Sequence, residues 1–346
     1  MHRIDLPRIV LVGQGVIDLL GEVCEELEIK RALMVSGERT YDAAGEKVQK
    51  ILGGKGIATE LIRARNADME TVERVRSWAV EIEADAVLGI GGGRTIDVAK
   101  LGAARGRTLF ISVPTAASHD GIASSLASIK GLERPYSVTA DVPIAVVADS
   151  RIVAESPFRF TASGCGDVIS KSVAVRDWRL AHKATGEYYG EYAGSLALMS
   201  ASMIMECAAQ IRDRLESGYR TLLEALVSCG VAMSIAGSSR PCSGSEHLFS
   251  HALDVIAPGA ALHGEQCGVG TIMMAKLHGL GWTSIRDSLR TIGAPTTARE
   301  LGIGEGVVVE ALVKAIEIRP ERYTILNEVK LTHATAEDLA RECGVI

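Results

Sequence analysis

Short apolar runs alternate with helical patterns over the first 158 residues. Runs of Val, Ile, Leu and Ala predict β-strands at 8–12, 31–36, 86–90, 108–113 and 145–148. Apolar residues at intervals of three and four predict helices at 16–26, 40–52, 71–81 and 97–104. The segment 126–138, which contains two turn signals, predicts a hairpin. Strand–helix alternation of this kind is typical of a parallel, doubly wound α/β sheet.

The pattern changes near 156–163, where strand signals end and long helical patterns rich in Ala, Met and Leu begin. Helices are predicted at 194–214, 219–237, 245–257, 266–280, 282–292 and 306–316. We therefore expect two domains. Residues 1–158 would form an α/β, Rossmann-like dinucleotide-binding domain, and residues 159–346 an all-α domain that binds metal and substrate.

Composition narrows the classes of function. The chain has 346 residues, of which 47% are hydrophobic and only 4% aromatic, and its net charge is -6. Because no basic run is present, we expect no nucleic-acid partner. An anionic small molecule stays possible, since one local Arg or Lys is enough to capture a phosphate.

Cysteine usage and the absence of long apolar runs predict a cytoplasmic protein. The seven cysteines are scattered without a C-x-x-C pair, which is typical of reduced thiols. The N-terminus has no signal-peptide pattern, and no apolar run approaches the roughly 20 residues of a membrane span. The Ala- and Val-rich helices suit subunit packing, so a homo-oligomer is expected.

Two small-residue loops follow predicted strands. Gly-Gly-Gly-Arg-Thr-Ile-Asp at 91–97 leads into a helix, a context in which the backbone can approach a pyrophosphate. It matches neither G-x-G-x-x-G nor a Walker A motif, and a tight turn alone would also explain it. The second loop, Pro-Thr-Ala-Ala-Ser-His-Asp-Gly at 114–121, strengthens the case for a dinucleotide that contacts both. Glu38 would favour NAD, whereas Arg39 could accept the 2′-phosphate of NADP, so the preference stays open.

Histidines gather in the second half. A helix at 245–257 would put His247 and His251 one turn apart on one face, and His263 follows the Pro-Gly break at 258–259. Three His or carboxylate ligands with one open position make a catalytic divalent-metal site. Spacing alone favours His247 and His251 as paired ligands, with His263 third and Asp167 contributed from elsewhere. Each residue also has a simpler explanation; Asp167, for example, could cap a helix starting at Val168.

These motifs carry a resemblance to a known family. The segments at 91–100, 114–121, 164–167, 239–247 and 263–266 resemble the iron/zinc polyol dehydrogenase superfamily, which includes glycerol dehydrogenase and dehydroquinate synthase. Ser-His-Asp-Gly and Ser-Arg-Pro-Cys-Ser-Gly-Ser-Glu-His are most similar to the archaeal sn-glycerol-1-phosphate dehydrogenases. The resemblance extends from the first strand to about residue 330, with several motifs in the same order.

The resemblance implies a metal, a cofactor and a substrate. Asp167, His247 and His263 would hold Zn²⁺, while His251 would face the substrate instead of the metal. Asp120 and Asp167 would contact the substrate as well. The residues implied in binding NAD or NADP are Gly93, Arg94, Thr95, Ile96, Asp97, Thr115, Ala116, Ala117, Ser118 and Ser124.

The implied reaction is the reduction of dihydroxyacetone phosphate to sn-glycerol 1-phosphate, the backbone of archaeal ether lipids. Asp120 and His251 are the candidate catalytic residues: His251, as an imidazole that titrates near neutral pH, or a water chain through Asp120 would deliver the proton. Arg240 is the candidate for the substrate phosphate, and the alternative is that it braces the helical domain.

Three other functions fit parts of the pattern. A glycerol or other polyol dehydrogenase would use the same fold on an unphosphorylated substrate. A lyase of the dehydroquinate synthase type would need a site rich in Lys and Arg, for which only Lys171, Arg176 and Arg240 are available. A non-catalytic nucleotide-binding protein would have no reason to keep three metal ligands.

Overall fold

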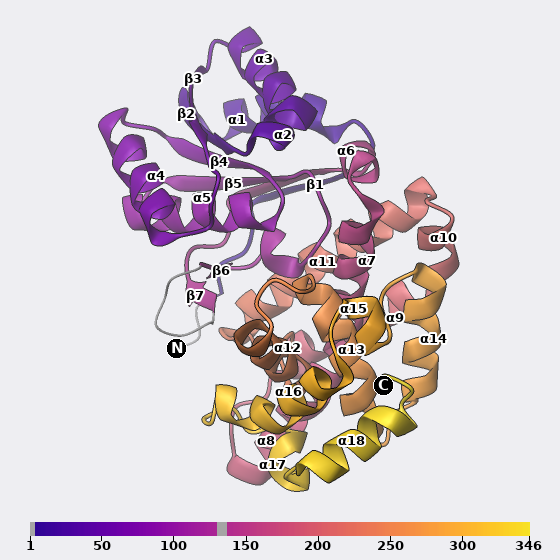
Figure 1. The fold of residues 1–346 in the computed structure, drawn as a ribbon. Helices are drawn as coiled ribbons and strands as arrows, with labels where there is room; N and C mark the ends of the chain where they lie inside the picture. Colours follow the sequence, from indigo (N-terminus) through magenta and orange to yellow (C-terminus); the bar gives the residue numbers. More distant parts are fainter. Residues whose placement is uncertain (1–3, 130–136) are drawn as a thin grey trace. The chain divides into compact units, whose positions relative to one another are not determined.

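A computed structural model of the chain describes residues 4–129 and 137–346. These residues form two compact units, which divide between Phe158 and Arg159. In Figure 1 the first unit runs from indigo to magenta along the sequence, and the second continues to yellow at the C-terminus. Each unit is described by itself below.

The first unit is built on a parallel sheet, as predicted, but the sheet has six strands where five were predicted, in the order β1-β8-β5-β4-β2-β3. The strands are β1 (Ile9–Gly13), β2 (Arg31–Ser36), β3 (Ala58–Arg63), β4 (Ala86–Gly91), β5 (Leu109–Pro114) and β8 (Ala145–Asp149). Strands β4 and β8 are buried along their whole length, which is why their sequences are nearly continuous apolar runs. β3 was not predicted: it pairs only with β2, and polar residues interrupt its apolar positions.

Helices cover both faces of this sheet. They are η1 (Val16–Leu19), α1 (Leu20–Glu26), α2 (Glu38–Thr40), η2 (Tyr41–Gly45), α3 (Glu46–Gly54), α4 (Met69–Glu81), α5 (Gly93–Gly106), η3 (Asp120–Ile122) and α6 (Ser150–Glu155). Alternate strand residues point to opposite faces, so Met34 packs in a core with α1 and α3, and Leu33 in a core with α4 and α5.

The predicted hairpin also forms. β6 (Leu126–Ser128) pairs antiparallel with β7 (Ser137–Thr139). Its turn, at 130–136, lies outside the described residues.

The second unit is helical throughout Arg159–Ile346. Its helices are α7 (Phe158–Ile169), α8 (Lys171–Thr185), α9 (Glu191–Glu206), α10 (Ala208–Arg212), α11 (Glu216–Ala236), α12 (Ser245–Ile256), α13 (His263–Leu277), α14 (Trp282–Ile292), α15 (Ala298–Leu301), α16 (Glu305–Ile318), α17 (Ile325–Val329) and α18 (His333–Glu342). α7 and α8 were not predicted, and the segment expected to be one helix at 194–214 is two, divided at Cys207.

Among the described residues, one helix is long and apolar enough to cross a membrane. α11 has 21 residues, and 67% of its most apolar window is buried within the fold. Such burial is typical of a core helix, so α11 gives no positive indication of a membrane span.

Candidate metal centre and cofactor loops

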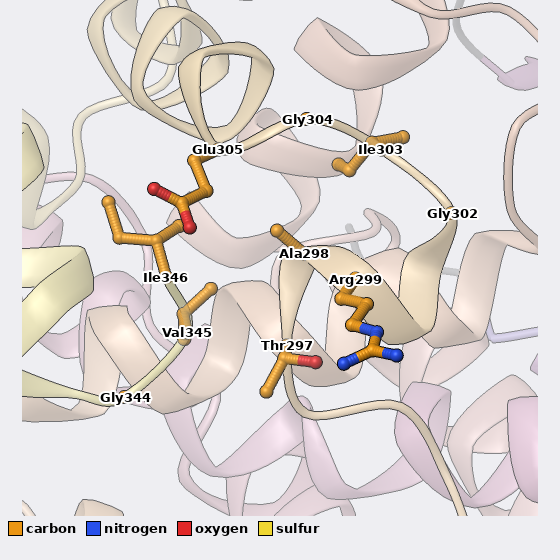
Figure 2. Close-up of a pocket in the computed structure, with 10 residues that line it drawn as sticks. All are labelled: Thr297, Ala298, Arg299, Gly302, Ile303, Gly304, Glu305, Gly344, Val345 and Ile346. Atoms are coloured by element: carbon orange, nitrogen blue, oxygen red, sulfur yellow. The ribbon is translucent and has the colours of Figure 1, made fainter.

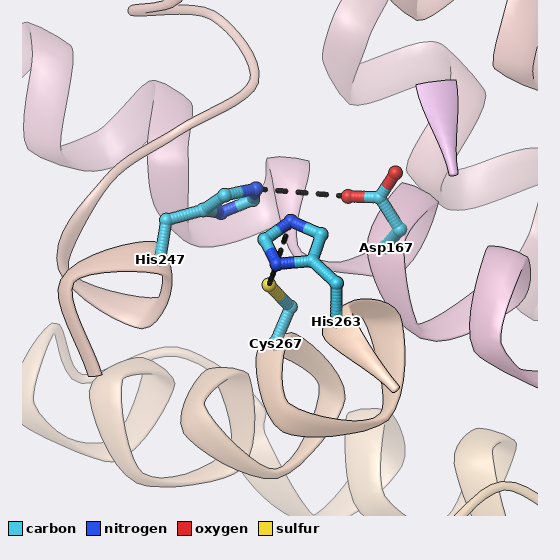
Figure 3. A group of neighbouring side chains, drawn as sticks. All are labelled: Asp167, His247, His263 and Cys267. Carbon is cyan, nitrogen blue, oxygen red and sulfur yellow. Dashed lines mark hydrogen bonds and ion pairs between the residues drawn. The ribbon is translucent and has the colours of Figure 1, made fainter. Parts of the chain in front are cut away.

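Three helices of the second unit bring four potential ligands together. Asp167 comes from α7, His247 from α12, and His263 and Cys267 from α13; one ligand atom of each lies within 4.8 Å of the others. Figure 3 shows the two imidazoles and the carboxylate turned toward one another, with Asp167 Oδ1 3.6 Å from His247 Nε2. The structure thus brings together the three residues singled out in the sequence, and it adds Cys267.

Glycines allow α7 and α13 to pack closely enough to bring Asp167 and His263 together. A Cβ on Gly166 would lie 2.3 Å from the Gly264 carbonyl oxygen, and a Cβ on Gly264 would lie 1.9 Å from the carbonyl oxygen of Ser163. No side chain fits at either position. The alternative explanation, a helix cap at Asp167, is therefore wrong: Asp167 lies inside α7, and the glycines before it belong to a helix crossing.

Hydrogen bonds orient both imidazoles. His247 Nδ1 lies 2.7 Å from Glu246 Oε1, and His263 Nδ1 lies 3.1 Å from Ser250 Oγ. Ser250 donates its own proton to Gln266 Oε1 at 2.6 Å, so it accepts from His263 Nδ1–H. Both histidines turn Nε2 toward the other candidate ligands: it lies 3.6 Å from Asp167 Oδ1 in His247 and 3.6 Å from Cys267 Sγ in His263. Carboxylates and hydroxyls commonly orient metal-bound histidines in this way.

Burial and neighbouring charge keep these groups in suitable protonation states. Burial, followed by the charge of Lys171, holds the pKa of His247 well below its usual value, so its imidazole is neutral. Lys171 is fully buried, and its Nζ lies 2.6 Å from Asp167 Oδ1, which balances that carboxylate. Burial raises the pKa of the Cys267 thiol well above its usual value. Imidazole nitrogens beside a carboxylate form a donor set that suits a divalent cation.

His251 lies beside this group without belonging to it. Its ring is 6.4 Å from the His247 ring and 5.9 Å from the His263 ring, measured between centroids. Burial, followed by the charges of His263, Arg319 and Arg322, lowers the pKa of His251 to about 3. The expectation that His251 titrates near neutral pH is therefore wrong. Its buried Nδ1 has no hydrogen-bond partner among the described residues.

Arg240 is 4% exposed, and protein groups occupy its guanidinium. Nε donates to Glu187 Oε1 at 2.6 Å, Nη2 pairs with Glu187 Oε2, and Nη1 donates to the Tyr323 carbonyl at 2.9 Å. These contacts support the bracing alternative over the substrate role. Glu187 lies 53 positions away in the chain, and no local sequence pattern indicates this pairing.

In the first unit, the two small-residue loops follow neighbouring strands, β4 and β5. α5 begins at Gly93 directly after β4, and a Cβ on Gly93 would lie 1.8 Å from His119 Nε2. Asp120 opens η3 in the second loop, where His119 Nδ1 accepts from Gly121 N–H at 2.9 Å. Glycine at 93 is thus required by the close approach of the two loops.

A buried lysine ties these loops to the hairpin. Lys100 Nζ donates to the carbonyls of Gly121 and Leu126, both at 2.6 Å, and lies 3.4 Å from Asp97 Oδ1. Asp97 Oδ2 in turn accepts from the backbone N–H of Ser128 at 3.1 Å. The buried members of the predicted cofactor set are Thr95, Ile96, Asp97, Thr115, Ala116, Ala117 and Ser124. Ile96 has no exposed surface.

Replacing Glu246 with Gln is expected to weaken divalent-metal binding about 10- to 100-fold, because the amide is a poorer acceptor for His247 Nδ1–H. Competition with a chromophoric chelator measures the affinity. Glu310→Gln, on the exposed side of α16 where Glu310 pairs with Lys314, is the matched control and should leave the affinity unchanged. Equal affinities for the Glu246 variant and the unmodified protein would contradict this role.

A separate pocket of about 520 Å³ opens where α15 and the C-terminus meet. Figure 2 shows Arg299 and Glu305 as the charged side chains among its lining residues. None of the candidate metal ligands lines it.

Comparison with known proteins defines the class. A family model described as iron-containing alcohol dehydrogenase matches residues 11–157. The crystal structure of glycerol dehydrogenase from Schizosaccharomyces pombe aligns with a TM-score of 0.81, covering 99% of this chain and 90% of that one at 17% identity. At 17% identity, this similarity shows a shared fold and nothing more. The first unit is thus similar to iron-containing alcohol dehydrogenases, and the whole chain shares the fold of glycerol dehydrogenase.

More similar sequences narrow the family. A protein of Methanosarcina acetivorans is 55% identical over 342 residues, covering 99% of this chain and 96% of the relative. One of Aeropyrum pernix is 51% identical over 347 residues, covering 100% and 99%. Both are named glycerol-1-phosphate dehydrogenase (NAD(P)⁺). The chain belongs to the glycerol-1-phosphate dehydrogenase family.

Proposed function

We propose that this protein catalyses the NAD(P)-dependent, zinc-dependent reduction of dihydroxyacetone phosphate to sn-glycerol 1-phosphate. The observation that carries the proposal is the group of Asp167, His247 and His263, in which a hydrogen bond at Nδ1 orients each imidazole. Full-length similarity to proteins named for this activity supports it. The product would supply the backbone of ether lipids.

Zinc is the metal we propose for this group. Three protein ligands, two of them histidines, with a fourth position open to substrate are typical of catalytic zinc sites. The bound metal would supply Lewis-acid polarisation of the substrate carbonyl, and the nicotinamide would supply the hydride.

The remaining roles belong to side chains near these ligands. Glu246 and Ser250 orient the imidazoles, and Lys171 balances the charge of Asp167. His251 is neutral, so it contributes a ring N–H or an unprotonated nitrogen to a hydrogen bond with the substrate. We assign substrate contact to His251 and to Asp120, and delivery of the proton either to His251 or to a water chain through Asp120.

The dinucleotide would bind the loops of the first unit. The first-turn amides of α5, at Gly93 and Arg94, are suited to the pyrophosphate because a helix N-terminus presents free N–H groups. The loop at 115–118 and Ser124 would contact the rest of the cofactor. We further propose that the enzyme works in the cytoplasm as a homo-oligomer.

A steady-state assay tests this function. The protein should oxidise NADPH or NADH in the presence of dihydroxyacetone phosphate, lose that activity after chelation, and recover it with Zn²⁺. Recovery with Fe²⁺ but not Zn²⁺ would overturn the metal assignment alone. Turnover of glycerol together with no reaction of dihydroxyacetone phosphate would instead favour a polyol dehydrogenase.

A further inference from the structure

Arg322 is a buried cation without a carboxylate partner. The residue is 7% exposed and lies in the turn between α16 and α17. Nη1 donates to the Ser243 carbonyl at 2.5 Å, and Nη2 donates to Ser239 Oγ at 2.8 Å. Arg322 forms no ion pair with any residue of 4–129 or 137–346. Such a charge is costly to bury unless an anion compensates it.

Two neighbouring arginines, Arg240 and Arg319, each have a carboxylate partner, whereas Arg322 has none among the described residues. Arg240 is paired with Glu187, and Arg319 Nε lies 3.0 Å from Glu321 Oε1. Arg322, in contrast, donates only to neutral groups of the described residues, the Ser243 carbonyl and Ser239 Oγ. Burial, followed by the charges of Arg319 and Arg240, lowers the pKa of Arg322 to about 9, whereas Glu187 and Glu246 act in the opposite direction.

This charge lies close to the histidine cluster. Ser239 and Ser243, which Arg322 contacts, belong to the segment that leads directly into α12 and His247. The positive charge of Arg322 is among the causes that lower the pKa of both His247 and His251, and Arg319 acts on His251 as well. An anion held at Arg322 would therefore sit near the side chain proposed to contact the substrate.

We propose that Arg322, assisted by Ser239 and Arg319, binds the phosphate group of the substrate. This inference rests on the proposed function. A guanidinium can give two parallel hydrogen bonds to a phosphate, and the dianion would supply the negative charge that this buried cluster lacks. In dihydroxyacetone phosphate the phosphorus is three bonds from the carbonyl carbon, so the phosphate has to bind beside the histidines. Arg322 contacts the segment that leads into His247, so it lies beside the histidines. Its hydrogen bonds within the described residues go only to neutral groups, which leaves its charge available to the phosphate.

The test compares two substrates that differ only in the phosphate. Arg322→Gln should lower kcat/KM for dihydroxyacetone phosphate about 100-fold or more, as expected for the loss of a desolvated charge pair. For unphosphorylated dihydroxyacetone, kcat/KM should stay within about threefold of the unmodified enzyme. Arg322→Lys should recover part of the selectivity. Equal losses on both substrates would overturn the proposal, because a residue that only braces the Ser239–Ser243 segment acts on both.

Binding of inorganic phosphate, measured by calorimetry on the metal-loaded protein, gives an independent readout. Phosphate should bind the unmodified protein and Arg212→Gln, an exposed control, but bind Arg322→Gln at least tenfold more weakly. Equal binding to all three would overturn the inference. This readout does not depend on turnover: absence of dihydroxyacetone phosphate reduction would refute the proposed function, whereas the phosphate result would still decide the role of Arg322.

Discussion

Replacing His263 with Ala is expected to lower kcat/KM for dihydroxyacetone phosphate by about 10³-fold or more. The change removes one of three candidate ligands, and a catalytic metal contributes several kcal/mol to transition-state stabilisation, of which about 4 kcal/mol corresponds to 10³ in rate. His263 is preferable to Asp167 for this purpose, because Asp167→Asn would also leave the buried Lys171 without its carboxylate. Steady-state kinetics and the metal content per chain measure the effect.

His333→Ala is the control for this prediction. His333 is exposed at the start of α18, so its loss should change neither turnover nor metal content. A His263 variant that retained a full complement of metal and normal turnover would remove His263 from the candidate centre.

Replacing Arg240 with Gln is expected to destabilise the protein by about 2–4 kcal/mol, because Glu187 loses its charged partner and the Tyr323 carbonyl loses its donor. Thermal unfolding measures the effect. The ratio of kcat/KM for dihydroxyacetone phosphate to that for dihydroxyacetone should not change, in contrast to the result expected for Arg322→Gln.

Arg212→Gln is again the matched control. Arg212 forms an ion pair with Asp213 on the exposed surface, and such pairs contribute little to the free energy of unfolding. An Arg240 variant with unchanged stability and a selective loss of activity on the phosphorylated substrate would restore Arg240 as the phosphate ligand and contradict the bracing role.

The sequence predicted the four central strands and one of the two edge strands, β1, and it missed the other edge strand, β3. β2, β4, β5 and β8 are central strands, and their continuous apolar runs are the direct result of helices covering both sides of the sheet. β3 has a single neighbour and exposed positions, so polar residues alternate along it. α7 was missed for a different reason: buried Ser and Gly residues replace the usual apolar stripe where the helix crosses α13.

The candidate site was only partly accessible from the sequence. Asp167, His247 and His263 stood out through their motifs, and the structure brings them together, while their role as ligands stays a prediction. The i+4 spacing of Cys267 after His263 was an available signal that was not used. The partners of Arg240 and Arg322, in contrast, lie 53 to 83 positions away, and such contacts depend on tertiary packing that has no local pattern.

The central claim is that dihydroxyacetone phosphate is reduced to the sn-1 product. The most direct test is to let the zinc-loaded protein reduce dihydroxyacetone phosphate with NADPH or NADH, remove the protein, and offer the product to a dehydrogenase specific for sn-glycerol 3-phosphate. We predict that a glycerol phosphate is formed in proportion to the cofactor oxidised and that the second enzyme does not oxidise it. Complete oxidation of the product by the second enzyme would contradict the account.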